Sequence, residues 1–459
     1  MPAVQRLRLQ LKAGLRATHS KFDCRCEAAL HALADRLAAA AALQELSVLW
    51  DVKRLLEGKD GAASSPAAFP LHAWMLLPAQ SRTARRAQRP LALGLRQLEL
   101  SCEAGCVLCR QLSLLPRLEE LSLGPGSRYW EEWAGPVAVP AHGPAACLPR
   151  TLTALRLSSG KAISSLANLG PALAAALPSL RALRMPVRYE VEWDADLNAD
   201  TGRLLDALRP LAGQLQVLEL PPLSLPLQVA RFTALEQLVV PPSPMWASSV
   251  ALGTASTWDD VLFHLGRLRS LDVCLSHPGF ESPPYMLPLP LAALPEGLTY
   301  LHFTTVPPAQ ASLPAGDYLR CLRHLALGPM SALRITPLLP FMSDLEQLTV
   351  EGQSDYREIP PVLHPRTLGS GDAALDAAAA AAAAMPLGSV AEQVAAAGQL
   401  AVALVRQRRF RRLCLLPAEL FSLYDEVRLV DPLACSLALR LSRLNPQLDV
   451  DVCFDKQLS

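Results

Sequence analysis

Three cysteines stand close together in the sequence, at Cys102, Cys106 and Cys109. Thiolates are soft ligands, and thiolates at this spacing could reach one zinc ion or one iron-sulfur cluster. The stretch directly follows LRQLEL, which has the pattern of a short strand. The alternative is that the side chains are structural, because free cysteine is among the residue types most often buried.

The spacing CxxxCxxC resembles the cluster-binding motif of radical S-adenosylmethionine enzymes. That resemblance implies a cluster inside a barrel of strands and helices, whereas the strand before Cys102 has the same pattern as many others in this chain. We therefore expect buried structural thiols, with no metal and no cofactor. A zinc site completed by Cys147 or a nearby histidine is the remaining alternative.

A second cluster of possible ligands lies in the stretch DADLNAD, which resembles the first half of an EF-hand calcium loop. Its alternating oxygen ligands are Asp194, Asp196, Asn198 and Asp200. The glycine of such a loop is replaced here by Ala199 and the bidentate glutamate by Leu205, so the features that the loop depends on are missing. We expect a polar insertion instead, in which Asp200 or Thr201 caps a helix from Gly202 to Leu208.

Residue sets typical of catalysis are missing from the sequence. It contains no phosphate-binding glycine loop, no HExxH motif and no recognisable Ser-His-Asp or Cys-His arrangement, and its 9 histidines are scattered. His302 and His324 stand in adjacent repeats, where they either contact a partner or form a solvated pair. The aromatic segment Arg128 to Trp133 either packs on a neighbouring helix or contacts a partner. We expect that the protein is not an enzyme.

One repeated unit, LxxLxL, organises the chain and must position all of these residues. From the first middle leucine to the last, nine steps cover 250 residues, so the mean step is about 28. The middle leucines are Leu98, Leu121, Leu155, Leu183, Leu218, Leu238, Leu271, Leu301, Leu325 and Leu348. Weaker copies occur at Val4 to Leu9, Leu43 to Val48, Phe410 to Leu415 and Leu448 to Phe454.

The spacing of the leucines predicts short parallel strands. The last two leucines of each unit are two residues apart and point to one face, and the residue between them points to the other. Return segments are predicted as helices at Ala28 to Leu46, Ala167 to Leu180 and Ser389 to Gln407. The return from Leu220 to Leu235 is too short and too rich in proline for a helix.

The repeats resemble those of the leucine-rich-repeat superfamily over nearly the whole chain. The resemblance implies an α/β solenoid with a curved parallel sheet on the concave face and with helices and irregular segments on the convex face. The consensus asparagine is replaced, for example by Glu103 and Gly126. A regular ladder of asparagine hydrogen bonds is therefore not expected.

Four regions follow along the chain. Residues 1–94 hold divergent repeats, 95–350 the core repeats, 351–388 an Ala-rich insertion, and 389–459 further divergent repeats and a cap. Three stretches exceed one repeat, at Gly124 to Pro149, Tyr189 to Asp200 and Glu351 to Pro386. The last ends in Ala377 to Ala384, which has no apolar stripe, so we expect a mobile or fraying insert rather than an ordered helix.

The composition limits which classes of partner and which cellular compartments are expected. The net charge is +1, so the overall positive charge typical of nucleic-acid binding is missing. No stretch of about 18 uninterrupted apolar residues could cross a membrane. The N-terminus does not have the pattern of a secretory signal, so the 11 cysteines should be reduced in an intracellular protein of the cytoplasm or nucleus.

These observations predict a protein-binding scaffold. The residues between the last two leucines mix both charge signs, as a protein-binding surface does, and should be exposed on the concave face. Partner binding is expected over the middle and C-terminal repeats. The residues expected to contact the partner are Arg184, Glu219, Asp272, His302, His324 and Thr349.

The alternative is the substrate-recognition subunit of a ubiquitin ligase, since F-box proteins often carry such repeats. Leu416 to Leu444 resembles an F-box in its LPAEL opening and later Asp-Pro-Leu, although it overlaps a repeat strand. An F-box upstream of the first repeat is the other form of this hypothesis.

Overall fold

A computed structural model describes only part of the chain, and it separates into two compact units, Met1–Pro221 and Pro222–Ser459. The boundary between the units falls inside the block 95–350, and the region boundaries expected from the sequence stay predictions. The described residues are 6–12, 44–51, 94–101, 115–123, 148–158, 160–187, 195–221, 225–241, 258–273, 294–303, 318–351, 373–383, 385, 389–416, 418–421, 426–429 and 432–452.

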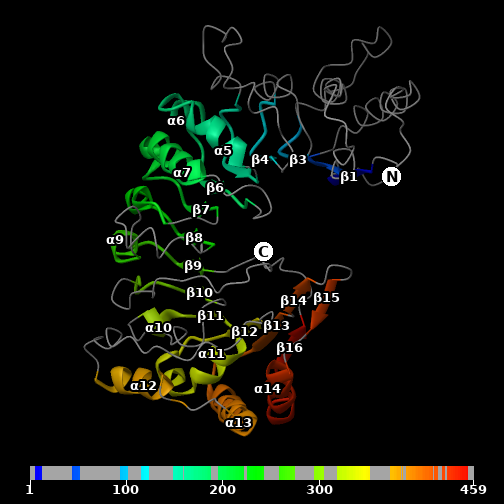
Figure 1. Cartoon of the computed structure of the whole chain (residues 1–459), viewed down its shortest axis with the longest axis vertical. Coiled ribbons are helices and arrows are strands. Elements are labelled where there is room, and N and C mark those ends of the chain that lie inside the picture. Colours follow the sequence, from blue (N-terminus) through cyan, green and yellow to red (C-terminus); the bar gives the residue numbers. More distant parts are fainter. Residues whose placement is uncertain are drawn as a thin grey trace. The chain divides into compact units, whose positions relative to one another are not determined.

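Unit 1 contains a parallel sheet whose strands pair in chain order (Figure 1). Its strands are β1 (Arg6–Lys12), β2 (Glu45–Asp51), β3 (Gln97–Ser101), β4 (Glu120–Leu123), β5 (Ala154–Leu157), β6 (Ala182–Arg184) and β7 (Val217–Glu219). Each strand coincides with one LxxLxL unit. The register places Leu98 beside Leu121 and Leu121 beside Leu155. The prediction of one strand for each repeat is confirmed.

The middle leucines of unit 1 form its core. Leu98, Leu121 and Leu155 are each less than 5% exposed, because they face the return segments. The residues on either side of each middle leucine point the other way. We call this second surface the open face; in unit 1 it includes Gln97 and Glu99 and the residues in register with them.

Helices in the returns of unit 1 cover the buried face. They are α5 (Gly160–Ala167), α6 (Ala172–Ala176), α7 (Ala195–Ala207) and the 3-10 helix η5 (Arg209–Leu211). The helix expected from Ala167 to Leu180 is therefore reduced to α6. The chain turns at Gly170, whose φ of 54° is a left-handed conformation that glycine adopts readily.

Asp200 and Thr201 do not cap a helix, which corrects the expectation from the sequence. Helix α7 begins at Ala195, so both residues lie inside it, and both are buried. The Asp200 carboxylate accepts a hydrogen bond from the Ser164 hydroxyl of α5 and pairs with Arg203. Asp200 thus joins two return helices, and Asp194 lies outside the described residues.

Unit 2 repeats the same arrangement, again with parallel strands. Its strands are β8 (Gln237–Val239), β9 (Ser270–Val273), β10 (Tyr300–Phe303), β11 (His324–Leu327), β12 (Gln347–Glu351), β13 (Arg412–Leu416) and β16 (Asp449–Val452). The middle leucines again lie beside one another, from Leu238 to Leu348 and on to Leu413. The four weaker repeat copies of the sequence correspond to β1, β2, β13 and β16, and they are confirmed.

The segment that resembles an F-box is continuous with the repeats. It begins at the last residue of β13 and continues through an antiparallel hairpin of β14 (Ala418–Phe421) and β15 (Glu426–Leu429). It ends with helix α14 (Pro432–Leu444), which packs against α13 (Val390–Arg406). The hairpin was not predicted from the sequence.

The remaining returns of unit 2 differ in regularity. They contain η6 (Leu227–Arg231), α9 (Trp258–Leu262), α10 (Tyr318–Cys321), α11 (Pro329–Arg334), η8 (Thr336–Phe341) and α12 (Ala373–Ala383). The proline-rich return at η6 forms only a short 3-10 helix, as its length required. The alanine run is helical in α12, so the expected fraying insert is wrong for these residues. Alanine has the highest helix propensity, and α12 also packs against η8.

Helix α13 confirms the helix expected from Ser389 to Gln407, and it begins with a capping box. The Ser389 hydroxyl accepts a hydrogen bond from the Glu392 backbone N–H at 3.2 Å, and the Glu392 carboxylate accepts one from the Ser389 N–H at 2.8 Å. Both interactions satisfy donors that the first turn leaves without partners.

We expect Ser389→Ala to lower the free energy of unfolding by about 1 kcal/mol, because the mutant loses the side-chain cap of α13. Urea unfolding followed by circular dichroism measures the change. Ser389→Asn is the matched control, since asparagine is also a good cap residue, and it should stay within a few tenths of a kcal/mol of the parent. Equal stability of Ser389→Ala and the parent would show that the cap contributes nothing.

Candidate functional site

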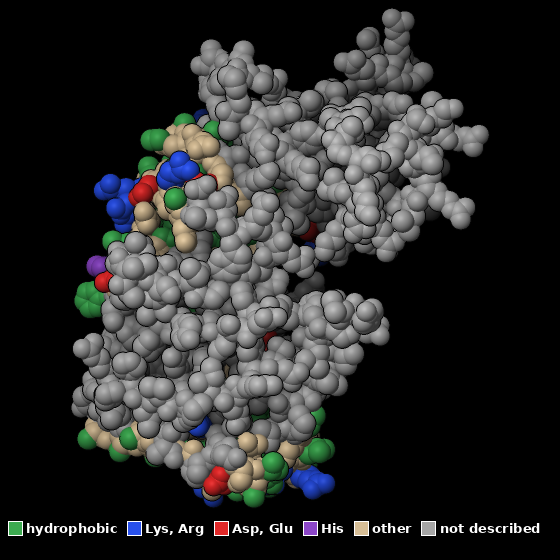
Figure 2. Space-filling model, viewed as in Figure 1, with side chains coloured by type: hydrophobic (Ala, Val, Ile, Leu, Met, Phe, Trp, Pro, Cys, Tyr) green, Lys and Arg blue, Asp and Glu red, His purple; other side chains and the backbone are tan. Residues whose placement is uncertain are grey.

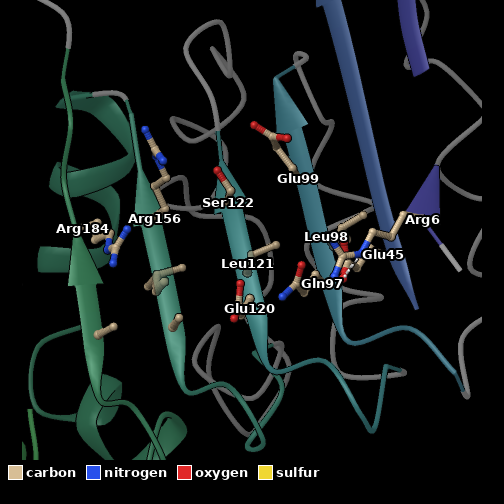
Figure 3. Close-up of a pocket in the computed structure, with 13 residues that line it drawn as sticks. Arg6, Glu45, Gln97, Leu98, Glu99, Glu120, Leu121, Ser122, Arg156 and Arg184 are labelled. Carbon is tan, nitrogen blue, oxygen red and sulfur yellow. Dashed lines mark ion pairs between the residues drawn. The ribbon is translucent and has the colours of Figure 1, made fainter. Parts of the chain in front are cut away.

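The open face of unit 1 is hollowed into a groove of about 710 Å³ (Figure 3). Strands β1 to β6 supply its lining, and every lining residue belongs to unit 1. The residues that line the groove are Arg6, Glu45, Gln97, Leu98, Glu99, Glu120, Leu121, Ser122, Ala154, Leu155, Arg156, Ala182 and Arg184. This groove is the candidate functional site.

Two arginines form one end of the groove. Arg156 of β5 and Arg184 of β6 are directly in register, so two guanidinium groups project from neighbouring strands. Both side chains are exposed. Among the described residues, neither arginine forms an ion pair or a hydrogen bond through its side chain. Like charges in register on adjacent strands repel each other, so this arginine pair is a positively charged site that would favour binding of an anionic group.

Carboxylates occupy the part of the groove over β2 to β4. Glu99 of β3 and Glu120 of β4 are exposed, and Figure 3 shows both between the arginine pair and the opposite end. At that opposite end Glu45 pairs with Arg6, with 2.9 Å between the carboxylate oxygen and Nε. Three arginines and three glutamates line the groove, so its formal charges cancel. The charges are nevertheless separated, because the glutamates lie on β2 to β4 and the arginine pair lies on β5 and β6.

Small side chains widen the positive end of the groove. Ala154 and Ala182 precede the two arginines by two residues on β5 and β6, so they share the open face with them. Both are in register with each other, and Ala154 is in register with Glu120. A methyl group at each position leaves room for an incoming side chain between Glu120 and the arginine pair.

The expected partner-binding residues are divided between the two units. Arg184 is exposed in the groove, and Glu219 is partly exposed on the neighbouring strand β7. The other four, Asp272, His302, His324 and Thr349, belong to unit 2. Their role in binding a partner stays a prediction, but their exposure is now defined.

On the open face of unit 2, the residue that follows each middle leucine is buried on β10 to β13, contrary to the expectation that it would be exposed. His302 is 7% exposed and Thr349 is 3% exposed. Ala326 and Cys414, which are in register with them on β11 and β13, are also buried. Buried side chains are not available to an incoming partner, so His302 and Thr349 are removed from the candidate surface.

His302 lies between two carboxylates. Its Nε2 is 3.1 Å from an oxygen of Glu351 on β12, and its Nδ1 is 2.9 Å from an oxygen of Asp272 on β9. The first contact has the alignment of a hydrogen bond, whereas the second has only the separation of an ion pair. A ring that faces carboxylates with both nitrogens donates to both only in its doubly protonated form. The side chains of His302 and Glu351 are about nine-tenths buried, and this network is therefore structural.

His324 is exposed, as expected, but it does not form a pair with His302. Tyr300 lies between them, and its ring centroid is 6.4 Å from each imidazole in an edge-to-face arrangement. The register explains this, because Tyr300 of β10 is opposite His324 of β11 and two residues from His302.

Other candidates from the sequence gain no structural support. Cys102, Cys106 and Cys109 lie outside the described residues, as does the segment Arg128 to Trp133. Within the described ranges no group of three histidine, cysteine or acidic side chains could hold a metal ion. No described helix has the length and apolarity needed to cross a membrane.

One further charged group on the open face is already neutralised. Arg412 of β13 pairs with Asp449 and Asp451 of β16. The hydrogen bond to Asp451 raises the pKa of Arg412 above its usual range. Over the returns, Figure 2 shows basic and acidic side chains close together, without a large area of a single charge among the coloured residues.

The sequence matches no protein-family profile and no curated protein. Similar architectures occur among solved structures. The leucine-rich-repeat protein LegL7 of Legionella pneumophila is 14% identical, with a TM-score of 0.33, over 72% of this chain and 93% of that one. A leucine-rich-repeat protein of Leptospira interrogans is 12% identical, with a TM-score of 0.28, over 98% of this chain and 90% of that one. Because these TM-scores are low, the architecture is assigned from the strand registers of this chain and not from its similarity to those structures. Each LxxLxL repeat forms one parallel strand, and the leucines of neighbouring strands are aligned. Both units have a leucine-rich-repeat fold.

Proposed function

We propose that the protein is a protein-binding scaffold and that the groove on the open face of unit 1 receives the partner. The observation that carries this proposal is the exposed arginine pair, Arg156 and Arg184, which forms no ion pair with a described side chain even though Glu219 is in register with Arg184 on β7. A surface that keeps like charges side by side loses stability unless a partner compensates them. The parallel sheet provides a fixed support for such charges.

The proposal places the partner nearer to the N-terminus than the sequence suggested. The stretch from Arg184 to Thr349 was expected to carry binding, but the open face is buried at His302 and Thr349. Only Arg184 of the six expected residues also lines the groove. Catalysis is not proposed; that the protein is not an enzyme stays a prediction. The ubiquitin-ligase hypothesis and the intracellular location stay predictions.

Blocking the groove tests the proposal without changing its charge. Ser122 lies at its centre and is partly exposed, so Ser122→Tyr adds a large side chain where the partner would lie. Ser179 is a matched control, because it is partly exposed in a turn of the same unit and does not line the groove. Chemical cross-linking and mass spectrometry after capture from native extract measure both the amount and the position of bound proteins.

We expect Ser122→Tyr to lower capture at least tenfold and Ser179→Tyr to leave it unchanged. Cross-links of the parent protein should concentrate on β3 to β6. Circular dichroism should show that both variants are folded. Equal capture by the two variants, or cross-links confined to the returns, would contradict the proposed function.

A further inference from the structure

We propose that the groove of unit 1 binds an extended polypeptide segment that carries acidic and basic side chains four residues apart. The inference rests on the proposed function and adds the chemistry of the partner. The acidic side chains would lie over Arg156 and Arg184, and the basic ones over Glu99 and Glu120.

The order of charges along the groove supports this partner. Glu99, Ser122, Arg156 and Arg184 are in register on successive strands β3 to β6. They present one negative charge, one neutral side chain and two positive charges in a single row; Glu219 of β7 follows in register with Arg184 but does not line the groove. Glu120 adds a second negative charge beside Ser122 on β4. A partner of uniform charge would be attracted at one end of the row and repelled at the other.

The distance between the charges determines their spacing in the partner. Neighbouring strands lie about 4.8 Å apart, so Glu99 and Arg184, three strands apart, are separated by roughly 14 Å. An extended chain advances about 3.3 Å for each residue, and side chains on the same face are an even number of residues apart. Four residues span roughly 13 Å and return to the same face, so an acidic and a basic side chain at this spacing match Arg184 and Glu99.

The partner must supply the opposite charges itself, because the groove has a surplus of cation at one end. Arg156 and Arg184 have no ion pair within the described parts of the chain, and planar guanidinium groups bind carboxylates with two hydrogen bonds each. The methyl groups of Ala154 and Ala182 leave space for acidic side chains to approach them. The equal numbers of arginines and glutamates in the lining disfavour a polyanion such as nucleic acid.

Synthetic peptides test the order of charges directly. The probe is ESESKSK, in which every glutamate is four residues from a lysine. The control is ESKSESK, which has the same composition but places like charges four residues apart. Fluorescence anisotropy with the full chain at low salt should give at least tenfold tighter binding of ESESKSK. Raising the salt concentration should weaken that binding, since exposed charges are screened.

Charge reversal in the protein supplies the second arm. Arg156→Glu with Arg184→Glu should weaken ESESKSK binding at least tenfold, and so should Glu99→Lys with Glu120→Lys. The variant with all four changes again has separated charges in the opposite order. It should recover most of the binding, because a peptide that lies in the groove can reverse its direction. A merely structural role of these residues would not produce this recovery.

Two exposed arginines outside the groove provide the matched control. Arg117→Glu with Arg209→Glu makes the same change in net charge at exposed arginines outside the groove and should leave binding unchanged. Equal affinity for the two peptides would overturn the inference. Tighter binding of ESESESE, or of an oligothymidylate, would overturn it too and would assign the groove to anions in general. Either result, combined with loss of protein capture in Ser122→Tyr, leaves the proposed function intact.

Discussion

Replacing Leu271 by alanine should lower the free energy of unfolding by about 2 to 5 kcal/mol. Leu271 is the middle leucine of β9, is 0% exposed and lies in register between Leu238 and Leu301. The change removes buried aliphatic surface and leaves a cavity, because the neighbouring strands are held by their backbone hydrogen bonds and cannot close the space. Urea unfolding followed by circular dichroism measures the loss.

Leu227→Ala provides the matched control in the same unit. Leu227 lies in η6 on a return segment and is 58% exposed, so its truncation removes little buried surface and should cost less than about 0.5 kcal/mol. Similar losses in both variants would mean that the middle leucine is not part of a packed core. That result would contradict the assignment of one buried strand to each repeat.

The strands were predictable from the sequence for a simple physical reason. Each repeat adds one strand to the leucine core and therefore needs the same spacing of apolar residues. The LxxLxL pattern accordingly occurs ten times in the chain. Even the divergent copies at β1 and β13 retain enough of it to be recognised. The positions of the strands in the two parallel sheets therefore follow from the periodicity alone, whereas the hairpin of β14 and β15 does not.

The returns were less predictable, because several local arrangements can connect two adjacent strands. Helix α13 has both an apolar face and a capping box, and it was identified within one residue at each end. Helix α7 begins at Ala195, before the residues Asp200 and Thr201 that were expected to cap it. Asp200 instead accepts a hydrogen bond from Ser164 on another helix. Such a contact between residues far apart in the sequence produces no local pattern.

The candidate site was also only partly predictable, because the sequence pattern gives the direction of a side chain but not what packs against it. That Arg184 is exposed follows from its place between two core positions. The burial of His302 does not, because the alternating pattern only assigns a residue to a face and does not say whether that face is covered. One signal was present: the open-face residues of β11 to β13 include Ala326, Thr349 and Cys414, which are small and uncharged. In unit 1 the corresponding positions include the charged residues Glu99, Arg156 and Arg184, and there the open face is exposed.

Replacing His302 by leucine should lower the free energy of unfolding by about 1 to 3 kcal/mol, although leucine suits a buried site. The imidazole lies between the carboxylates of Asp272 and Glu351, which have side-chain exposures of 24% and 10%. Without the ring, two acidic groups remain at a poorly solvated site and lose the ring nitrogens that face them. Removing one partner of a buried hydrogen bond costs more than the bond contributes, because the remaining group is left without its partner.

A mutant cycle separates this electrostatic cost from a change in packing. Asp272→Asn and Glu351→Gln remove the negative charges with little change of shape, so adding both to His302→Leu should recover most of the lost stability. The same two changes in the presence of His302 should destabilise the protein, since the ring then faces neutral amides in place of the carboxylates. Urea unfolding of the four proteins gives the coupling free energy. A coupling near zero would show that His302 contributes only its volume. A large one would show that the charge of Asp272 supports the fold of unit 2, so reversing that charge cannot serve as a test of partner binding.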